Sequence, residues 1–85
     1  MDIKETIREF IIKYFLKGEE SKIFGDDDSF LEEGIIDSVG VLELVAFLEE
    51  TFSFRVGDEE ITPANLDSVN QLVVYVQSKL ISNNS

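Results

Sequence analysis

The chain has 85 residues, of which 44% are hydrophobic, and its net charge at pH 7 is −11. This composition suits one small packed domain over residues 1–85 and excludes a disordered tail. Cysteine and histidine are absent, which excludes disulfides, thiolate zinc sites, a cysteine nucleophile and a histidine general base. We expect no metal site, and any thiol used in its chemistry must come from outside the chain.

The negative charge is unevenly distributed. Residues 1–22 contain equal numbers of basic and acidic side chains, so the whole net charge of −11 lies in residues 23–85. Such a surface repels nucleic acid phosphates and attracts proteins with basic patches. The N-terminus does not have the pattern of a signal peptide, and no apolar stretch is long enough to span a membrane. We expect a cytoplasmic protein that binds neither nucleic acid nor membrane.

Apolar residues at helical spacing predict a first helix over residues 2–17: Ile3, Ile7, Phe10, Ile11 and Tyr14. Asp2 can cap the start of this helix and Gly18 its end. Residues 18–37 then form a long acidic connection, and a loop of this length in a small domain is usually functional or held by its own side chains. With a turn at Gly34, four apolar residues are expected to fold back onto the core: Phe30, Leu31, Ile35 and Ile36.

A second helix is predicted over residues 38–52, where apolar residues occur on most faces. Asp37 and Ser38 stand where an N-cap is expected. Helical spacing allows one set of apolar side chains to face the core: Leu42, Val45, Leu48 and Phe52. This helix is therefore expected to be central to the fold.

Two further helical segments follow. Thr62 as N-cap and Pro63 at the first helical position predict a short helix over residues 62–66. A last helix is predicted over residues 68–81, because a capping-box pattern precedes a helical stripe: Ser68 and Gln71, then Val69, Leu72, Val73, Val76 and Leu80. The expected fold is all-α, a small four-helix bundle of three longer helices and one short helix, with a long loop between the first two.

The most informative segment runs from Asp28 to Val39 and ends in an Asp37-Ser38 pair at a helix start. Together with the patterns of the later helices, it resembles the acyl and peptidyl carrier family over roughly residues 3–81. The resemblance implies a carrier without enzymatic activity, to which a phosphopantetheinyl transferase attaches 4′-phosphopantetheine from coenzyme A. The attachment residue would be Ser38. Asp37 would be the flanking acid, with a role in binding the metal ion that the transferase uses.

The alternative for Ser38 is an ordinary N-cap. A capping box would need Glu or Gln three residues later, but Val41 follows Ser38 at that spacing and Gly40 follows Asp37. A serine at a helix start is also exposed, close to free backbone N–H groups and the positive end of the helix dipole, which favours a phosphodiester there. These features favour the modified serine.

Partner enzymes are expected to bind one face of the second helix. Spacings of four, three and four residues place a mixed acidic and apolar set on that face: Val39, Glu43, Ala46 and Glu50, with Glu49 at its edge. The resemblance implies basic patches on the transferase and on adenylating ligases, synthases or acyltransferases that use the carrier. We expect a monomer, since the chain must visit several partners. The alternative is an ordinary solvated helix face.

Some residues depart from the pattern of common fatty acid carriers. Those carriers usually have Leu and Asp where this chain has Val39 and Gly40, and a larger apolar residue at Ala46. Residues 61–68 are more similar to stand-alone carriers that work beside an acyl- or aminoacyl-adenylating ligase. We expect an acyl carrier of a specialised lipid or secondary-metabolite pathway. The alternatives are an aminoacyl or peptidyl carrier served by an adenylating ligase, and an unmodified acidic interaction module.

Two further functions are excluded by spacing and size. The acidic run over residues 26–33 does not fit a calcium loop, because Phe30 and Leu31 occupy positions that need an oxygen ligand and a glycine. Glycoside hydrolysis needs two carboxyl groups across a cleft, and a bundle of this size offers little cleft.

Overall fold

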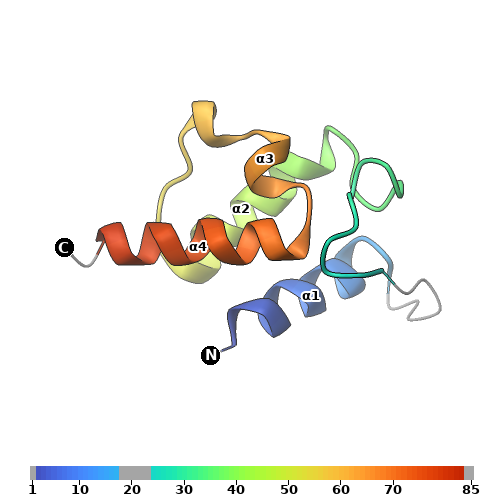
Figure 1. Ribbon diagram of the computed structural model, residues 1–85, viewed down its shortest axis with the longest axis horizontal. Helices are drawn as coiled ribbons and strands as arrows, with labels where there is room; N and C mark the ends of the chain where they lie inside the picture. The colour runs from blue at the N-terminus through green and yellow to red at the C-terminus, as the bar shows by residue number, and fades with distance from the viewer. Residues whose placement is uncertain (1, 18–23, 84–85) are drawn as a thin grey trace.

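The computed structural model describes residues 2–17 and 24–83, and these are all-helical (Figure 1). The helices are α1 (Ile3–Tyr14), α2 (Gly40–Phe52), α3 (Pro63–Leu66) and α4 (Val69–Asn83), with a short 3₁₀ turn, η1 (Asp58–Glu60), before α3. Within the described ranges there is no strand. The all-α bundle with one short helix and a long connection between α1 and α2 is confirmed.

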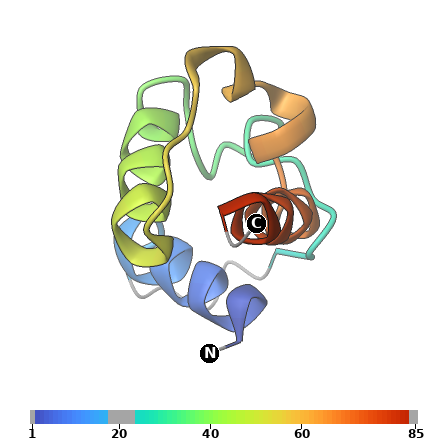
Figure 2. The same ribbon diagram turned by 90° about the vertical axis from the view of Figure 1, so that its left-hand side faces the viewer.

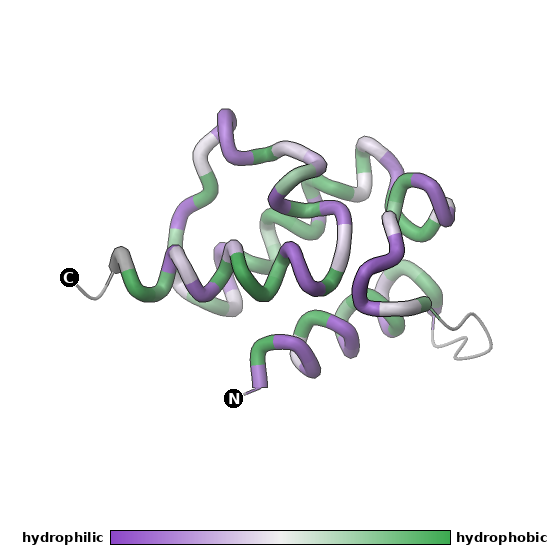
Figure 3. Tube along the Cα trace, viewed as in Figure 1, coloured by the Kyte–Doolittle hydropathy of each residue, from purple (hydrophilic) through white to green (hydrophobic). Residues whose placement is uncertain are grey.

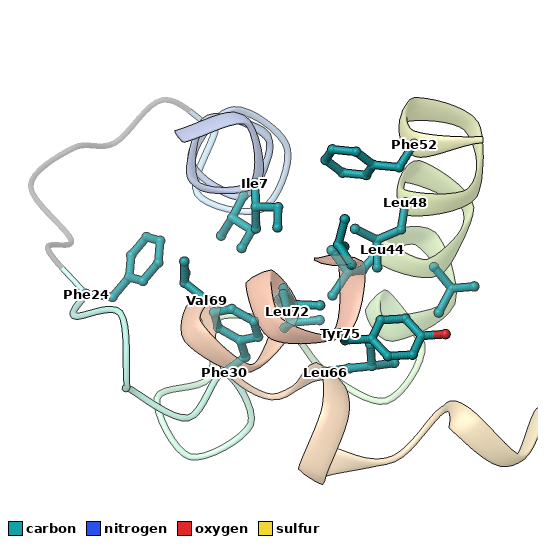
Figure 4. Packing of buried hydrophobic residues seen from close by; sticks show 14 of the residues in the cluster. Ile7, Phe24, Phe30, Leu44, Leu48, Phe52, Leu66, Val69, Leu72 and Tyr75 are labelled. Carbon is teal, nitrogen blue, oxygen red and sulfur yellow. The ribbon is translucent and has the colours of Figure 1, made fainter. Parts of the chain in front are cut away.

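Helix α4 is the centre of the arrangement. Figure 2 looks nearly along α4 and shows α1, α2 and α3 placed around it. Hydrophobic and hydrophilic residues alternate along α1 and α4 in Figure 3, as expected for helices with one buried face. The buried side chains come from every helix and from the connection, and converge between them (Figure 4): Ile7, Phe24, Phe30, Leu44, Leu48, Phe52, Leu66, Val69, Leu72 and Tyr75.

Helix α1 ends at Tyr14, earlier than the predicted residue 17. Its start is as expected, because Asp2 Oδ1 accepts the Glu5 N–H at 3.0 Å. At its end the Leu16 N–H bonds the Ile11 carbonyl, and Leu16 is buried. Lys17 then leaves the helical conformation with a φ of 52°. The predicted end residue Gly18 lies outside the described residues.

The connection before α2 is tied to α1 by ion pairs. Arg8 donates to Asp26 Oδ1 at 2.8 Å and to the Phe24 carbonyl at 3.1 Å. Lys4 lies 3.0 Å from the other oxygen of Asp26. The ammonium of Lys4 and the guanidinium of Arg8 hold the pKa of Asp26 below its usual range, against the opposing effect of partial burial.

The later part of the connection folds back as predicted, except at one residue. Phe30 and Ile36 are both 1% exposed, and Gly34 turns the chain with a φ of +69°. Leu31 was expected in the core but is 46% exposed. The reason is that Phe30 already fills the space under this turn, which leaves Leu31 on its outer side.

The inner face of α2 differs from the prediction at one position. Val45, Leu48 and Phe52 are buried as expected, but Leu42 is 60% exposed and Leu44 takes the buried place. At about 100° per residue, Leu44 points in nearly the same direction as Leu48, whereas Leu42 points well away from it. Because α2 is apolar on most faces, its sequence alone does not indicate which of these two leucines is buried.

The last two helices begin close to the predicted residues. Pro63 is the first residue of α3, and Thr62 precedes it in an extended conformation without a side-chain cap hydrogen bond. Ser68 Oγ accepts the Gln71 N–H at 3.2 Å, while Gln71 Oε1 accepts the Asp67 N–H at 3.1 Å. This is a variant of the predicted capping box, in which glutamine reaches the residue before the cap.

Candidate functional site

Asp37 acts as the cap of α2 and leaves Ser38 free. Asp37 Oδ1 accepts the Gly40 N–H at 2.7 Å, and the Asp37 carbonyl accepts the Val41 N–H at 3.1 Å. Val39 already has helical dihedral angles, with φ −76° and ψ −40°. Ser38 is therefore the first residue after the cap, although regular α2 is counted from Gly40. The N-cap alternative for Ser38 does not hold in this geometry.

The Ser38 hydroxyl is open to reagents. Ser38 is exposed, and within residues 2–17 and 24–83 its Oγ has no hydrogen-bond partner. The following residue, Val39, is 70% exposed. A primary hydroxyl in this position can be approached from solvent and can carry a substituent without disturbing the packing beneath it.

Gly40 explains how the helix start reaches the core. A Cβ atom at Gly40 would lie 3.0 Å from Phe15 Cε1, 3.1 Å from Ile36 Cγ2 and 3.2 Å from Asp37 Oδ1. The absence of a side chain therefore lets this turn pack directly on α1 and on the end of the connection. The sequence showed Gly40 only as a departure from a family pattern, and the structure gives that departure a packing reason.

An apolar pocket of about 190 Å³ opens beside Ser38. It lies between the end of the connection, the start of α2 and the α3 region, and its lining is mostly apolar: Leu31, Ser38, Val41, Ile61, Thr62, Pro63, Leu66 and Asp67. Because Ser38 is part of this lining, a flexible group attached to its hydroxyl has an apolar surface immediately beside it. Sequence reasoning did not find this pocket, because its walls come from segments that meet only in the folded chain.

Asp67 fixes the wall of the Ser38 pocket. Its Oδ1 accepts the Leu31 N–H at 3.1 Å, and its Oδ2 accepts a short hydrogen bond from the Ser29 hydroxyl. Its backbone carbonyl also accepts the Phe30 N–H at 2.9 Å. One residue between α3 and α4 thus holds the turn that places Leu31 at the pocket.

The predicted partner face is present as a continuous exposed surface. Val39, Glu43, Ala46 and Glu50 are all exposed on the outer side of α2. Leu42 joins them, which sequence reasoning missed because it assigned Leu42 to the core. A docking role for these residues stays a prediction.

Glu49 has a different environment from the other residues of that set. It is half-buried, and its Oε2 accepts the Val56 N–H at 2.9 Å. It therefore helps to hold the segment after α2. Its predicted role as a charge contact at the edge of the docking face stays a prediction.

The segment after α2 is held further by Glu60, which accepts hydrogen bonds from the Gly57 N–H at 2.8 Å and from Lys79 Nζ at 3.0 Å. The same two donors lower the pKa of Glu60. Burial, together with the nearby carboxylate of Glu60, raises the pKa of Tyr75 to about 12. These groups keep this segment in place ahead of the pocket residues Ile61 and Thr62.

Across residues 2–17 and 24–83, no three acidic side chains come together in a way that could hold a metal ion. None of the helices found there is long and apolar enough to cross a membrane.

Comparison with known proteins gives one family match and several similar relatives. The family model described as phosphopantetheine attachment site matches residues 5–76, a stretch that contains Ser38 and the whole pocket lining. A D-alanyl carrier protein of Streptococcus pyogenes serotype M5 is 32% identical over 77 residues, covering 91% of this chain and 94% of that protein. A D-alanyl carrier protein of Streptococcus suis is 33% identical over 73 residues, covering 86% and 89%. One of Abiotrophia defectiva is 30% identical over 54 residues, covering 64% and 68%.

Proposed function

Because the chain belongs to the phosphopantetheine-binding carrier family, we propose that Ser38 is the attachment residue and that the cargo is a small aminoacyl group. Proteins of this family are carriers without catalytic activity, and their cofactor is covalently attached 4′-phosphopantetheine. The attached group supplies a thiol that holds an acyl group as a thioester for delivery to partner enzymes. Those partners include a phosphopantetheinyl transferase and a ligase.

The observation that supports Ser38 most strongly is its freedom from capping. Asp37 supplies the cap, so the Ser38 oxygen can form the phosphodiester bond and lose its proton without a change in the helix start. The first N–H groups of a helix and the positive end of its dipole stabilise an anion at this position by about 0.3–1 kcal/mol. Asp37 is itself exposed, which fits a role in binding the metal ion of the transferase.

The aminoacyl cargo is supported by two observations. The relatives described above are D-alanyl carrier proteins, and the pocket beside Ser38 is small, about 190 Å³. A long apolar chain would need more space than this. We therefore place the protein beside a ligase that activates a small amino acid such as D-alanine by adenylation.

The second candidate is the acyl carrier of a specialised lipid or secondary-metabolite pathway that the sequence predicted. The mostly apolar lining of the Ser38 pocket favours it. The names of the relatives give no support to fatty acid biosynthesis or lipid metabolism as its setting. The cytoplasmic location, the monomeric state and the single domain over residues 1–85 stay predictions.

Incubation with coenzyme A and a broad-specificity phosphopantetheinyl transferase, followed by intact-mass measurement, tests the attachment residue. The wild-type chain is expected to gain one phosphopantetheine, and Ser38→Ala is expected to gain none. Ser53→Ala is a matched control, since Ser53 is an exposed serine at the other end of α2 and this variant should load fully. An unchanged wild-type mass would indicate the unmodified interaction module, and loading of Ser38→Ala would place the arm elsewhere.

A further inference from the structure

We propose that the outer face of α4 is a self-association surface, on which two copies of this chain pair weakly with their α4 helices antiparallel. A hollow of about 340 Å³ opens between α3 and the first half of α4 (Figure 1), and we call it the α3–α4 hollow. Its lining residues are all uncharged: Ala64, Asn65, Asn70, Gln71, Val74, Tyr75 and Ser78. This pairing does not depend on the proposed function, since it needs no group attached to Ser38.

Helix α4 differs from the rest of the chain in its lack of charge. Charged residues make up 29% of the whole sequence, but Lys79 is the only one in residues 69–83. Lys79 is half-buried and lies 3.0 Å from Glu60 Oε1, which neutralises its charge locally. Asp27 reaches only the edge of the α3–α4 hollow, where its carboxylate accepts the Asn70 side-chain N–H at 2.6 Å. The exposed side chains described on α4 are amides, a hydroxyl and aliphatic groups: Gln71, Val74, Gln77, Ser78 and Ile81.

Two large aliphatic side chains project from this neutral face. Val74 is 66% exposed and Ile81 is 72% exposed. They are seven residues apart, which places them on nearly the same side of the helix, about 10 Å apart along its axis. Val74 lines the α3–α4 hollow, and Ile81 lies beyond it toward the end of α4. One helix therefore presents both a hollow and, two turns further on, a projecting apolar side chain.

The hollow and the projecting side chain are self-complementary when two copies are related by a twofold axis. In such an interface residue i of one copy contacts residue j of the other, and j contacts i. With the axis between Gln77 and Ser78, the two α4 helices run antiparallel, and Ile81 of each copy enters the α3–α4 hollow of the other copy beside Val74. Parallel helices would place the two Ile81 side chains together and leave both hollows open, so the antiparallel arrangement fits better.

Charge favours a second copy over a strongly charged partner. A basic or acidic partner surface would lose hydration on this face without gaining an ion pair, which is unfavourable. Two copies each carry a net charge of −11, so they can approach most closely where neutral surface meets neutral surface. The side-chain amides of Gln71 and Gln77 both donate and accept hydrogen bonds, so they can pair with amides of the same kind.

The small size of this surface makes the pairing weak. A stable interface uses about 20–30 residues on each side, and the hollow together with the exposed face of α4 provides far fewer. We expect a Kd of about 0.1–1 mM, so the monomer predicted from the sequence is the main species at micromolar concentration. The pocket beside Ser38 and the α3–α4 hollow share no lining residue, so pairing does not fill the Ser38 pocket.

Sedimentation equilibrium of the unmodified full chain, from micromolar to low millimolar concentration, measures the pairing. The average mass is expected to rise toward that of a dimer, and to rise further at high salt, because salt screens the repulsion between two acidic copies. Val74→Ser and Ile81→Ser should each weaken association by about fivefold or more. Tyr14→Ser removes an exposed apolar side chain from α1 instead and should leave association unchanged. Circular dichroism checks that the variants keep the fold.

Cross-linking tests the antiparallel arrangement, because the chain has no cysteine of its own. Val74→Cys and Ile81→Cys each introduce one thiol on the outer face of α4. The two variants are mixed in equal amounts and oxidised gently. Random collision would make about half of the cross-linked product the mixed disulfide, whereas antiparallel pairing should make it the main product.

Four results would overturn this assignment. A mass that stays at one chain up to millimolar concentration would show that there is no pairing, and weaker association at high salt would indicate contact between opposite charges. An equal loss in Tyr14→Ser and Ile81→Ser would indicate non-specific apolar association. Disulfides in random proportions, or mostly between two Ile81→Cys chains, would contradict antiparallel helices. None of these measurements requires loading of Ser38, so this proposal and the proposed function fail separately.

Discussion

The capping of α2 offers a stability test of the candidate site. The Asp37 side chain accepts the Gly40 N–H at 2.7 Å, whereas the Ser38 side chain forms no hydrogen bond with the described residues. We therefore expect Asp37→Ala to destabilise the protein and Ser38→Ala to leave its stability nearly unchanged. The opposite ranking is expected if Ser38 were the cap.

The size of the effect follows from the contacts that each variant loses. Loss of a side-chain N-cap costs about 0.5–2 kcal/mol, and a negative charge in the first turn adds about 0.3–1 kcal/mol. We expect Asp37→Ala to cost about 1–2 kcal/mol, which lowers Tm by at least about 4 °C in a domain of this size. Ser38→Ala should stay within about 0.5 kcal/mol of wild type.

A conservative variant separates the two roles of Asp37. Asp37→Asn keeps an acceptor oxygen for the Gly40 N–H but removes the charge, so it should cost less stability than Asp37→Ala while still slowing the transferase reaction at Ser38. Thermal unfolding followed by circular dichroism gives the stabilities, and mass spectrometry over time gives the loading rate. A Tm loss in Ser38→Ala as large as that in Asp37→Ala would refute the assignment of the cap.

Three further outcomes are expected. Gly40→Val should lower the free energy of unfolding, measured in urea, by about 1–3 kcal/mol, because a Cβ atom at this position would lie 3.0–3.2 Å from atoms of Phe15, Ile36 and Asp37. An unchanged midpoint of urea unfolding would contradict this packing. The pKa of Asp26 is lower in the folded than in the unfolded chain, so its ion pairs stabilise the fold above about pH 4 and stop doing so as the pH falls through the folded pKa. Asp26→Asn should therefore be less stable than wild type at pH 7 and equally stable at low pH. A difference in stability between the two proteins that does not change with pH would refute the pairing. If the cargo is a small aminoacyl group, the octanoyl form should melt no higher than the free-thiol form; a clearly higher Tm would favour the acyl carrier.

The helices, and the place of the Asp37-Ser38 pair at a helix start, could be predicted from the sequence because both depend on local patterns. The stripe of α4 is buried as expected, with Val69, Leu72 and Val76 each 0% exposed. The Asp37-Ser38 pair stands at a helix start because capping needs only residues that are adjacent in the chain. In both cases the spacing of residues within one segment was enough to predict the local structure.

The remaining features depend on contacts between distant segments. Leu42 and Leu44 are chemically alike, and only the packing of α2 in the folded chain decides which of them is buried. Leu31 is exposed because Phe30 occupies the space beneath it. Glu49 resembles its neighbours in sequence, but its carboxylate is engaged by the Val56 N–H. The pocket beside Ser38 has no pattern within a single segment, because its walls come from distant parts of the chain.

The site of the attached arm can be located by fragmentation of one peptide. Trypsin cleaves after Lys22 and Arg55, and the peptide between them carries four hydroxyl side chains: Ser29, Ser38, Thr51 and Ser53. After loading from coenzyme A, tandem mass spectrometry of this peptide should place the whole added mass on Ser38. The same mass on any other hydroxyl, or a loaded chain in which this peptide is unmodified, would contradict the account.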